Sequence, residues 1–270
     1  RRPARRDLRS RLRSVKVGRT DDLGAHDCIL RAYDYHNSRD ADLYYPVRDC
    51  LRGTIDSDPS YADAWAWLAR MVLEEHAYGY AAKDGADAPP LDRALDYARK
   101  ATELAPENQT AHYILARTHY LRHDRVAFLM SADRAVKLNP NHAAVIGDLG
   151  ALRSYVGEDQ RQHGIEWLRK AVTLNPRYPA WYYLALFWKE YWDRDYDAAL
   201  AYVHKIDMPK YFWRYALLAA AYGQLGRDQD AEVALKNLLE LYPDFAAKAR
   251  EEFEIWIYEK AAVDHQLEGF

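Results

Sequence analysis

Apolar and small residues recur along the chain at helical spacing, and the segment from Phe212 to Pro243 shows this pattern most completely. Its members are Tyr215, Leu218, Ala219 and Tyr222 in the first half, then Gly226, Ala231, Leu235 and Pro243. Small Ala219 and Ala231 allow two helices to approach closely, while the larger apolar residues fill the space between them. Pro243 ends the second helix because proline cannot donate the backbone hydrogen bond. The segment therefore predicts a pair of antiparallel helices.

Prolines that close such helix pairs recur at a nearly constant interval. They are Pro59, Pro106, Pro140, Pro176, Pro209 and Pro243, and successive prolines lie 47, 34, 36, 33 and 34 residues apart. Apart from the first, these intervals are close to the period of about 34 residues of tetratricopeptide repeats. No strand-like alternation is present. The sequence therefore predicts an all-α, tetratricopeptide-type α-solenoid, a right-handed superhelix of antiparallel helix pairs with a C-terminal capping helix.

The predicted organisation is a basic segment followed by one solenoid. Residues 1–22 are expected to be a linker or the end of a preceding domain, and residues 23–270 the solenoid. The predicted units are a degenerate repeat at 25–59, repeats at about 60–106, 107–140, 141–176, 177–209 and 210–243, and a cap at 244–270. The additional length of the first interval falls in residues 74–90, whose Gly, Asp and Pro content predicts an inserted loop.

Charge and hydropathy limit the classes of partner. The net charge is −3, but residues 1–20 carry about +8, so the remainder carries about −11. An acidic body argues against nucleic-acid binding by the solenoid. The basic segment is either a surface helix for anionic lipid or nucleic acid, or a solvated linker. No apolar run approaches the ~20 residues that span a bilayer, so membrane attachment is expected only through a segment upstream of Arg1.

The two cysteines, Cys28 and Cys50, are too few for a disulfide scaffold in a chain of this length. They are either free thiols or a pair on facing helices in an oxidising compartment. The sequence leaves both readings open.

Several segments resemble one protein family. They are GAHDCILRAYDYHN, YADAWAWLA, MPKYFWRYALLAAAYGQLGR and LYPDFAAKAREEFEIW. They are similar to the C-terminal tetratricopeptide region of multidomain bacterial signalling proteins, namely class III adenylate cyclase-like proteins and related winged-helix regulators in which the repeats follow a TolB-like segment. The resemblance covers roughly residues 22–270, and the DCILRA and MPKYFW runs are its more specific parts. It implies the regulatory half of a signalling protein, cytoplasmic or periplasmic according to the upstream region. It implies no cyclase activity here, because the chain offers no strands to carry metal-binding aspartates.

Three histidines are candidates for a metal site. His112, His119 and His123 have spacings of 7 and 4, which place them along one face of a helix, and imidazoles so arranged can ligate Zn²⁺. The alternative is packing, because His112 and His119 occupy repeat positions that face the partner helix. No cysteine or carboxylate completes a site, so we expect no metal and no cofactor.

Enzymatic chemistry has little support. Glu74, Glu75 and His76 permit acid–base chemistry, but a charged helix end beside a loop gives the same residues. No nucleophile motif and no glycine-rich phosphate loop accompanies them. We therefore predict a protein that is not an enzyme.

The concave groove of the predicted solenoid is the candidate binding site. In this repeat class, ligand contacts come from the first helix of each repeat. The corresponding positions are Arg70, Tyr113, Arg117, Tyr120, Asp148 or a near neighbour, Tyr183 and Phe187. Such a groove holds an extended peptide, with aromatic anchors and Arg for a carboxylate. The alternative is that some of these tyrosines pack between repeats.

The leading hypothesis is therefore a non-enzymatic protein–protein interaction scaffold that binds a peptide or protein in its groove. We expect Arg117→Glu to abolish partner binding and to leave helicity intact. The Lys and Asn clamp that grips the acidic tails of heat-shock chaperones is absent, since its positions read Ala66, Arg70, Tyr113, Arg117, Gly147 and Ala151. The alternative is a homo-oligomerisation module in which Trp181 and Trp192 are buried in a contact between copies. A small-molecule or metal sensor built on His112 and His119 is the third hypothesis.

Overall fold

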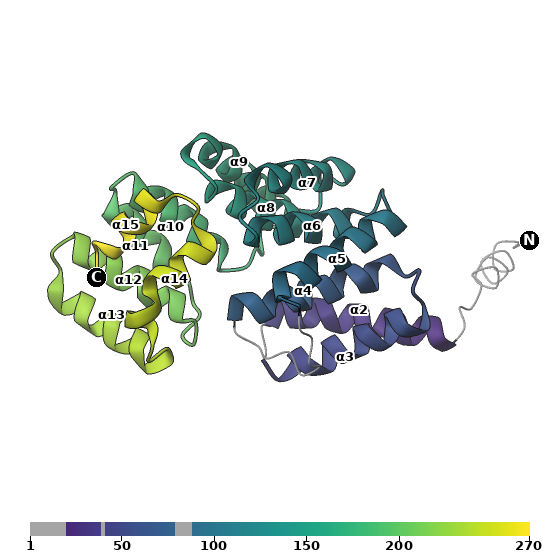
Figure 1. Cartoon of the computed structure of the whole chain (residues 1–270). Coiled ribbons are helices and arrows are strands. Elements are labelled where there is room, and N and C mark those ends of the chain that lie inside the picture. The colour runs from purple at the N-terminus through teal and green to yellow at the C-terminus, as the bar shows by residue number, and fades with distance from the viewer. Residues whose placement is uncertain (1–19, 39–40, 79–87) are drawn as a thin grey trace, which may run out of the picture.

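The computed structural model describes residues 20–38, 41–78 and 88–270, and in these ranges every regular element is an α-helix. The helices are α2 (Thr20–Ser38), α3 (Ala41–Ser57), α4 (Ala62–Tyr78), α5 (Pro90–Leu104), α6 (Gln109–Leu121), α7 (Arg125–Leu138), α8 (Ala143–Ser154), α9 (Glu158–Leu174), α10 (Tyr182–Trp192), α11 (Tyr196–Val203), α12 (Phe212–Gln224), α13 (Asp228–Leu241), α14 (Phe245–Trp256) and α15 (Lys260–Leu267). Successive helix pairs stack along the chain, as the colour gradient of Figure 1 shows. The predicted all-α solenoid is confirmed.

Small residues set the closest approach between paired helices. A Cβ atom placed on Gly164 of α9 would lie 2.5 Å from the carbonyl oxygen of Gly150 and 2.5 Å from the backbone nitrogen of Ser154, both in α8. No side chain fits at such a distance, so the α8–α9 pair depends on glycine at this crossing. In α12, the small residue Ala219 is likewise buried.

A disulfide ties the first two described helices together. Cys28 of α2 and Cys50 of α3 are bonded, with their Cα atoms 5.6 Å apart. This answers the question that the sequence left open. The bond lies beside a small apolar cluster of α2, α3 and α4, which is separate from the large cluster formed by α4 to α15.

Two predicted segments fall largely outside the described residues. The basic segment 1–22 is described only from Thr20, where α2 begins. Of the expected insertion at 74–90, residues 79–87 lie outside the described ranges, whereas α4 continues through Tyr78. Glu74, Glu75 and His76 are therefore helical residues. None of the helices in the described ranges is both long and apolar enough to cross a membrane.

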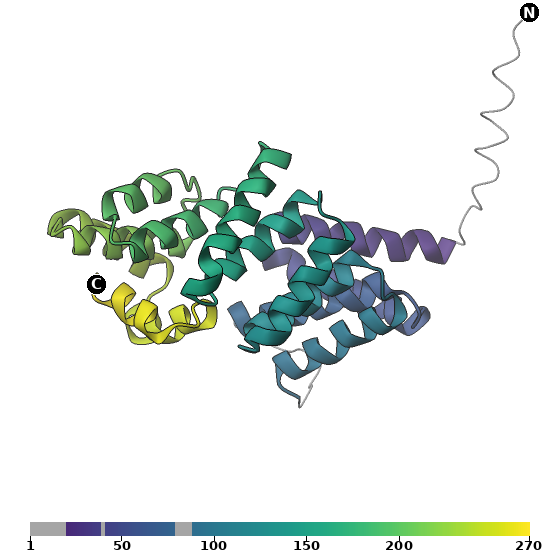
Figure 2. The ribbon, with the colours of Figure 1, turned by 90° about the horizontal axis from the view of Figure 1, so that it is seen from above.

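The C-terminal residues form two helices, where the sequence predicts one capping helix. Phe245, at the start of α14, packs on the rings of Phe212 and Trp213 in α12. From this point α14 turns away from the end of the stack, and α15 returns beside α10 and α11 (Figure 1). The view from above shows both helices along one side of the solenoid (Figure 2).

Candidate functional site

A cavity of about 660 Å³ lies between the first helices of successive pairs and α14. We call it the concave cavity. Nine of its twenty lining residues are aromatic: Tyr35, Tyr155, Trp181, Trp188, Tyr211, Phe212, Trp213, Phe253 and Trp256. Seven are aliphatic or methionine, and four are charged: Glu74, Arg117, Asp148 and Lys210. Its volume is within the range of ligand pockets, about 300–1,000 Å³.

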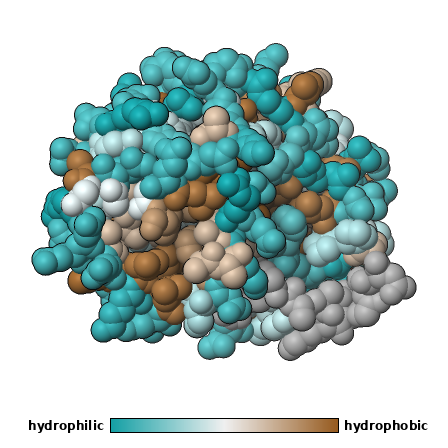
Figure 3. All heavy atoms as spheres, turned by 60° about the vertical axis from the view of Figure 1, so that its left-hand side comes forward, coloured by the Kyte–Doolittle hydropathy of each residue, from teal (hydrophilic) through white to brown (hydrophobic). Residues whose placement is uncertain are grey.

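Hydrophobic side chains also gather at the surface of the molecule. On the face drawn in Figure 3 they occupy a recessed area that hydrophilic residues surround. An apolar recess with a polar rim is the usual form of a binding site on a soluble protein.

One unbroken run of residues supplies much of the cavity wall. Met208, Pro209, Lys210 and Tyr211 precede α12, and Phe212 and Trp213 begin it; all six line the cavity. They form the MPKYFW run of the sequence. The connection from α11 to α12 spans residues 204–211, and it carries these side chains to the first-helix side of the solenoid.

The end of α14 and the residue after it form another part of the wall. Phe253, Trp256 and Ile257 line the cavity. Phe253 is fully buried, with its ring centroid 5.8 Å from that of Trp188 and 5.2 Å from that of Trp213. The wall is therefore held by aromatic packing on α10 and α12.

Polar contacts hold the turn between α14 and α15 against distant repeats. The backbone N–H of Tyr258 donates to the carbonyl oxygen of Tyr155 at 3.3 Å. The Tyr258 hydroxyl donates to the carbonyl oxygen of Tyr120, and the Tyr120 hydroxyl donates to that of Trp256. Glu259 accepts from the backbone N–H of Glu158 at 3.0 Å.

The end of α15 is held in the same manner. The carbonyl oxygen of His265 accepts from the Tyr191 hydroxyl at 3.3 Å and from Nε2 of Gln224 at 3.4 Å. A Cβ atom on Gly223 would lie 2.0 Å from the carbonyl oxygen of Gly269, so the chain end lies against α12. We call residues 245–270 the C-terminal strap, because it crosses the ends of α6, α8, α10 and α12.

The charged residues in the cavity wall form buried ion pairs. Arg117 donates to Asp148, and Arg70 pairs with Glu74 one turn further along α4. Burial alone lowers the pKa of Arg117, but the Asp148 carboxylate outweighs it and raises the pKa above its usual value. Burial likewise raises the pKa of Asp148, and Arg117 outweighs it, so the pKa falls below its usual value. Both groups are therefore ionised at neutral pH.

Of the seven predicted groove residues, Arg117 and Asp148 line the concave cavity. The other five are Arg70, Tyr113, Tyr120, Tyr183 and Phe187. Arg70 and Tyr113 are buried beside the ion pairs, and Tyr120 is fully buried and bonded to the strap. Phe187 is fully buried within the core. Tyr183 contacts Tyr178 and Tyr202, toward α11.

The burial of Arg117 corrects one sequence-based expectation. Arg117→Glu places a second carboxylate next to Asp148 in a buried position, where two like charges are strongly unfavourable. Loss of binding in this variant would therefore come with loss of stability. Residues at the cavity wall that are partly exposed, such as Leu184, give a better test.

Most of the aromatic wall was not predicted from the sequence. Trp188, Trp213 and Phe253 lie outside the groove positions that repeat counting selects, and α14 was expected to close the end of the stack. The signal that was available is the MPKYFW run, in which three consecutive aromatic residues span the end of the predicted connection and the start of the following helix.

The candidate metal and acid–base residues have separate structural partners. Nε2 of His112 lies 2.9 Å from the carbonyl oxygen of Pro106. His123 lies beyond the end of α6 and stacks on Tyr258, with ring centroids 4.4 Å apart. Burial lowers the pKa of His119. Within the described ranges, no three His, Cys, Asp or Glu residues lie together as a metal site would require.

Glu75 takes part in a buried cluster on the other side of α4. It accepts from Arg93 of α5, and it also accepts from the Tyr44 hydroxyl of α3 at 3.1 Å. Glu75 therefore joins α4 to α3 and α5, whereas Glu74 pairs with Arg70 within α4.

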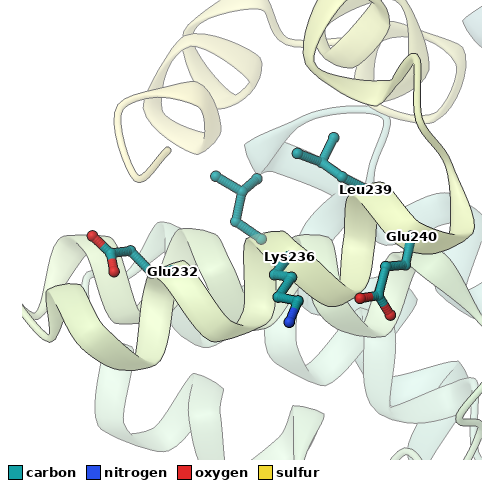
Figure 4. A pocket seen from close by; sticks show the side chains of 5 residues that line it. Glu232, Lys236, Leu239 and Glu240 are labelled. Carbon is teal, nitrogen blue, oxygen red and sulfur yellow. The ribbon is translucent and has the colours of Figure 1, made fainter.

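A second, shallower hollow of about 570 Å³ lies on α13. Its lining residues are Glu232, Leu235, Lys236, Leu239 and Glu240, and in Figure 4 the side chain of Leu239 points to one side of α13 whereas those of Lys236 and Glu240 point to the other.

Comparison with known proteins identifies the architecture. Residues 214–245 match the tetratricopeptide repeat family. The chain is a tetratricopeptide-type solenoid. PilF of Pseudomonas aeruginosa aligns over 87% of this chain and 100% of its own, with a TM-score of 0.56 and 18% identity. A tetratricopeptide repeat protein from Parabacteroides merdae aligns over 92% and 98%, with a TM-score of 0.51 and 16% identity.

A larger assembly contains the same architecture. The APC/C hetero-tetramer Cut9–Hcn1 aligns over 89% of this chain with a TM-score of 0.64 and 18% identity, and the aligned part is 45% of that chain. At these identities the likeness concerns the fold. No curated protein matches the sequence.

Proposed function

We propose that this chain is a non-enzymatic protein-interaction scaffold that binds a peptide, or a segment of a protein, in the concave cavity. The observation that carries the proposal is a half-open cavity of about 660 Å³ whose wall is rich in Trp, Tyr and Phe. Large aromatic side chains supply most of the binding energy at protein interfaces, and they do so best around a desolvated pocket.

The C-terminal strap supports this proposal. The strap itself packs on this side of the solenoid through buried aromatic side chains and through hydrogen bonds to backbone carbonyl groups. A ligand in the remaining cavity would have the same kinds of contact available on α8, α10 and α12.

The test is selection from a random peptide library displayed on phage, with wild type beside Leu184→Glu. Leu184 is a partly buried cavity residue on α10, and Leu174→Glu is the matched control at the exposed end of α9. A carboxylate on the apolar wall should weaken binding of a selected peptide at least about tenfold. Equal enrichment by wild type and Leu184→Glu would refute the assignment of the site.

Homo-oligomerisation is the second hypothesis, and the structure changes the residues on which it rests. Trp181 and Trp192 are both partly buried, and Trp192 stacks on Trp188. The hollow on α13 is a second candidate for contact between copies, because the partly buried Leu235 and Leu239 line it. Sedimentation velocity over a range of concentrations, with Leu239→Glu as the variant, tests this hypothesis.

A role in a longer bacterial signalling protein of the adenylate cyclase-like class rests on the sequence resemblance. Under this hypothesis the solenoid is the regulatory part. The Cys28–Cys50 disulfide favours an oxidising compartment such as the periplasm. Alkylation of thiols in intact cells, followed by mass spectrometry of the Cys50 peptide, tests the compartment; full alkylation without reductant would contradict it.

A further inference from the structure

The polar groups that line the concave cavity are unevenly divided between acceptors and donors. Both acidic side chains of the lining are already bound to arginine: Asp148 to Arg117, and Glu74 to Arg70. Their charges are therefore compensated within the protein, and they are poor sites for a cationic ligand.

The donors in the same wall are not all used. Arg117 is 5% exposed, yet its Nε has no hydrogen-bond partner among the described residues. Lys210 is exposed at the cavity and makes no ion pair with any residue that the structure describes. Four tryptophans also line the cavity, namely Trp181, Trp188, Trp213 and Trp256. Their indole N–H groups donate no hydrogen bond to any residue that the structure describes.

Besides this surplus of hydrogen-bond donors, the site has a net positive charge. Arg117, Lys210 and the paired Arg70 carry three positive charges, and the two carboxylates carry two negative ones. The site therefore has one uncompensated positive charge, on Lys210. A single anionic group complements it, whereas a second cation is repelled.

From these observations we propose that the peptide bound in the concave cavity carries a carboxylate next to a large apolar side chain. The apolar side chain packs on the aromatic wall formed by α10 and α12. The carboxylate accepts from the Lys210 ammonium group and from indole or guanidinium N–H donors of the wall. This inference rests on the proposed function and specifies its ligand.

Lys210 belongs to the MPKYFW run, so a single segment supplies both parts of the recognition. Met208, Phe212 and Trp213 contribute apolar surface, and Lys210 contributes the charge. The carboxylate has two possible sources in a peptide, an Asp or Glu side chain and the C-terminal carboxyl group. Both present the same chemistry to Lys210.

The experiment uses the full chain and a random nonapeptide library in two formats. In one format the peptides have a free C-terminus, and in the other the C-terminus is blocked by fusion. The proteins are wild type, Lys210→Glu and, as matched control, Lys205→Glu. Lys205 lies in the same connection but contacts the rings of Tyr183 and Tyr202 and does not line the cavity.

Wild type and Lys205→Glu are expected to enrich peptides with an acidic group beside a large apolar residue. If only the free format yields them, the group is the C-terminal carboxylate; otherwise it is a side chain. For a synthetic copy of the best peptide, Lys210→Glu should weaken binding about fivefold, the upper end of the effect of losing one exposed ion pair. A copy with Gln in place of the acid, or with an amidated C-terminus, should bind wild type and Lys210→Glu equally.

Other outcomes overturn the inference in distinguishable ways. Enrichment of apolar peptides without an acidic group, or an acidic preference that survives in Lys210→Glu, refutes the carboxylate and leaves peptide binding intact. Failure of every protein to enrich any peptide refutes the proposed function together with this inference. Circular dichroism of each variant confirms that the exposed substitutions leave the fold unchanged.

Discussion

The Phe253→Ala variant tests how the C-terminal strap is held. Phe253 is fully buried, and its ring lies 5.8 Å from that of Trp188 and 5.2 Å from that of Trp213. Replacing a buried Phe with Ala typically costs about 3–5 kcal/mol. The nearest rings, Trp188 and Trp213, lie on α10 and α12, and the more distant Phe245 and Phe270 lie within the strap, so most of this energy is removed from the docking of the strap.

Since about 1.4 kcal/mol corresponds to a factor of ten, the strap should open at least about 100-fold more often. Hydrogen exchange followed by mass spectrometry measures this opening for α14 and α15, with α8 and α9 as internal reference. Glu251→Ala, an exposed change on the same helix, is the control. Equal exchange of α14 in the two variants would refute the packing argument. Equal acceleration in α8 and α9 would show that the strap does not open separately.

Three further predictions concern stability. Gly164→Ala should lower the free energy of unfolding, measured in urea, by about 1–3 kcal/mol, because the added methyl group overpacks against α8. Gly53→Ala, in open space on α3, should raise it by about 0.5–1 kcal/mol. An unchanged stability of Gly164→Ala would contradict the close approach of α8 and α9. Asp148→Asn should lower the free energy of unfolding by about 3–5 kcal/mol, because it leaves the Arg117 charge buried without a counter-charge. Thermal unfolding measures this loss, and a loss below about 1 kcal/mol would show that water reaches the ion pair. Burial lowers the pKa of His265 from 6.5, so the unfolded chain binds a proton that the folded chain does not, and stability should fall as pH is lowered through 6.5. His265→Gln should reduce this dependence, and an unchanged slope between about pH 7.5 and 5.5 would exclude His265 as its source.

The helix-pair architecture could be predicted from the sequence because it depends on local spacing. Small residues such as Ala219 and closing prolines such as Pro243 act within one repeat, and their effect is visible in a window of about 34 residues. The same local reasoning placed Arg117 and Asp148 on the first-helix side, where both line the cavity.

The C-terminal strap could not be predicted in this way. Its partners, Tyr120 and Tyr155, lie about 100 residues or more before it, and nothing in the spacing of Phe253 or Tyr258 indicates them. Repeat counting also treats each first-helix position as exposed to the groove. Phe187 and Tyr120 are instead covered by neighbouring helices and by the strap, so their burial follows from long-range packing.

The strap also gives this solenoid long-range contacts, which affect the order in which it folds. In a simple repeat array each unit contacts only its neighbours, so contacts are local and the ends can fray independently. Here the hydrogen bonds of Tyr120 with Trp256 and Tyr258 join residues separated by 136 and 138 positions, and the Glu158–Glu259 contact spans 101. Contacts of such length form late in folding, because the intervening chain must be ordered first. During synthesis, therefore, α6 to α12 can stack before their first-helix side is covered, and the contacts of the strap form only after residues 245–270 have been made.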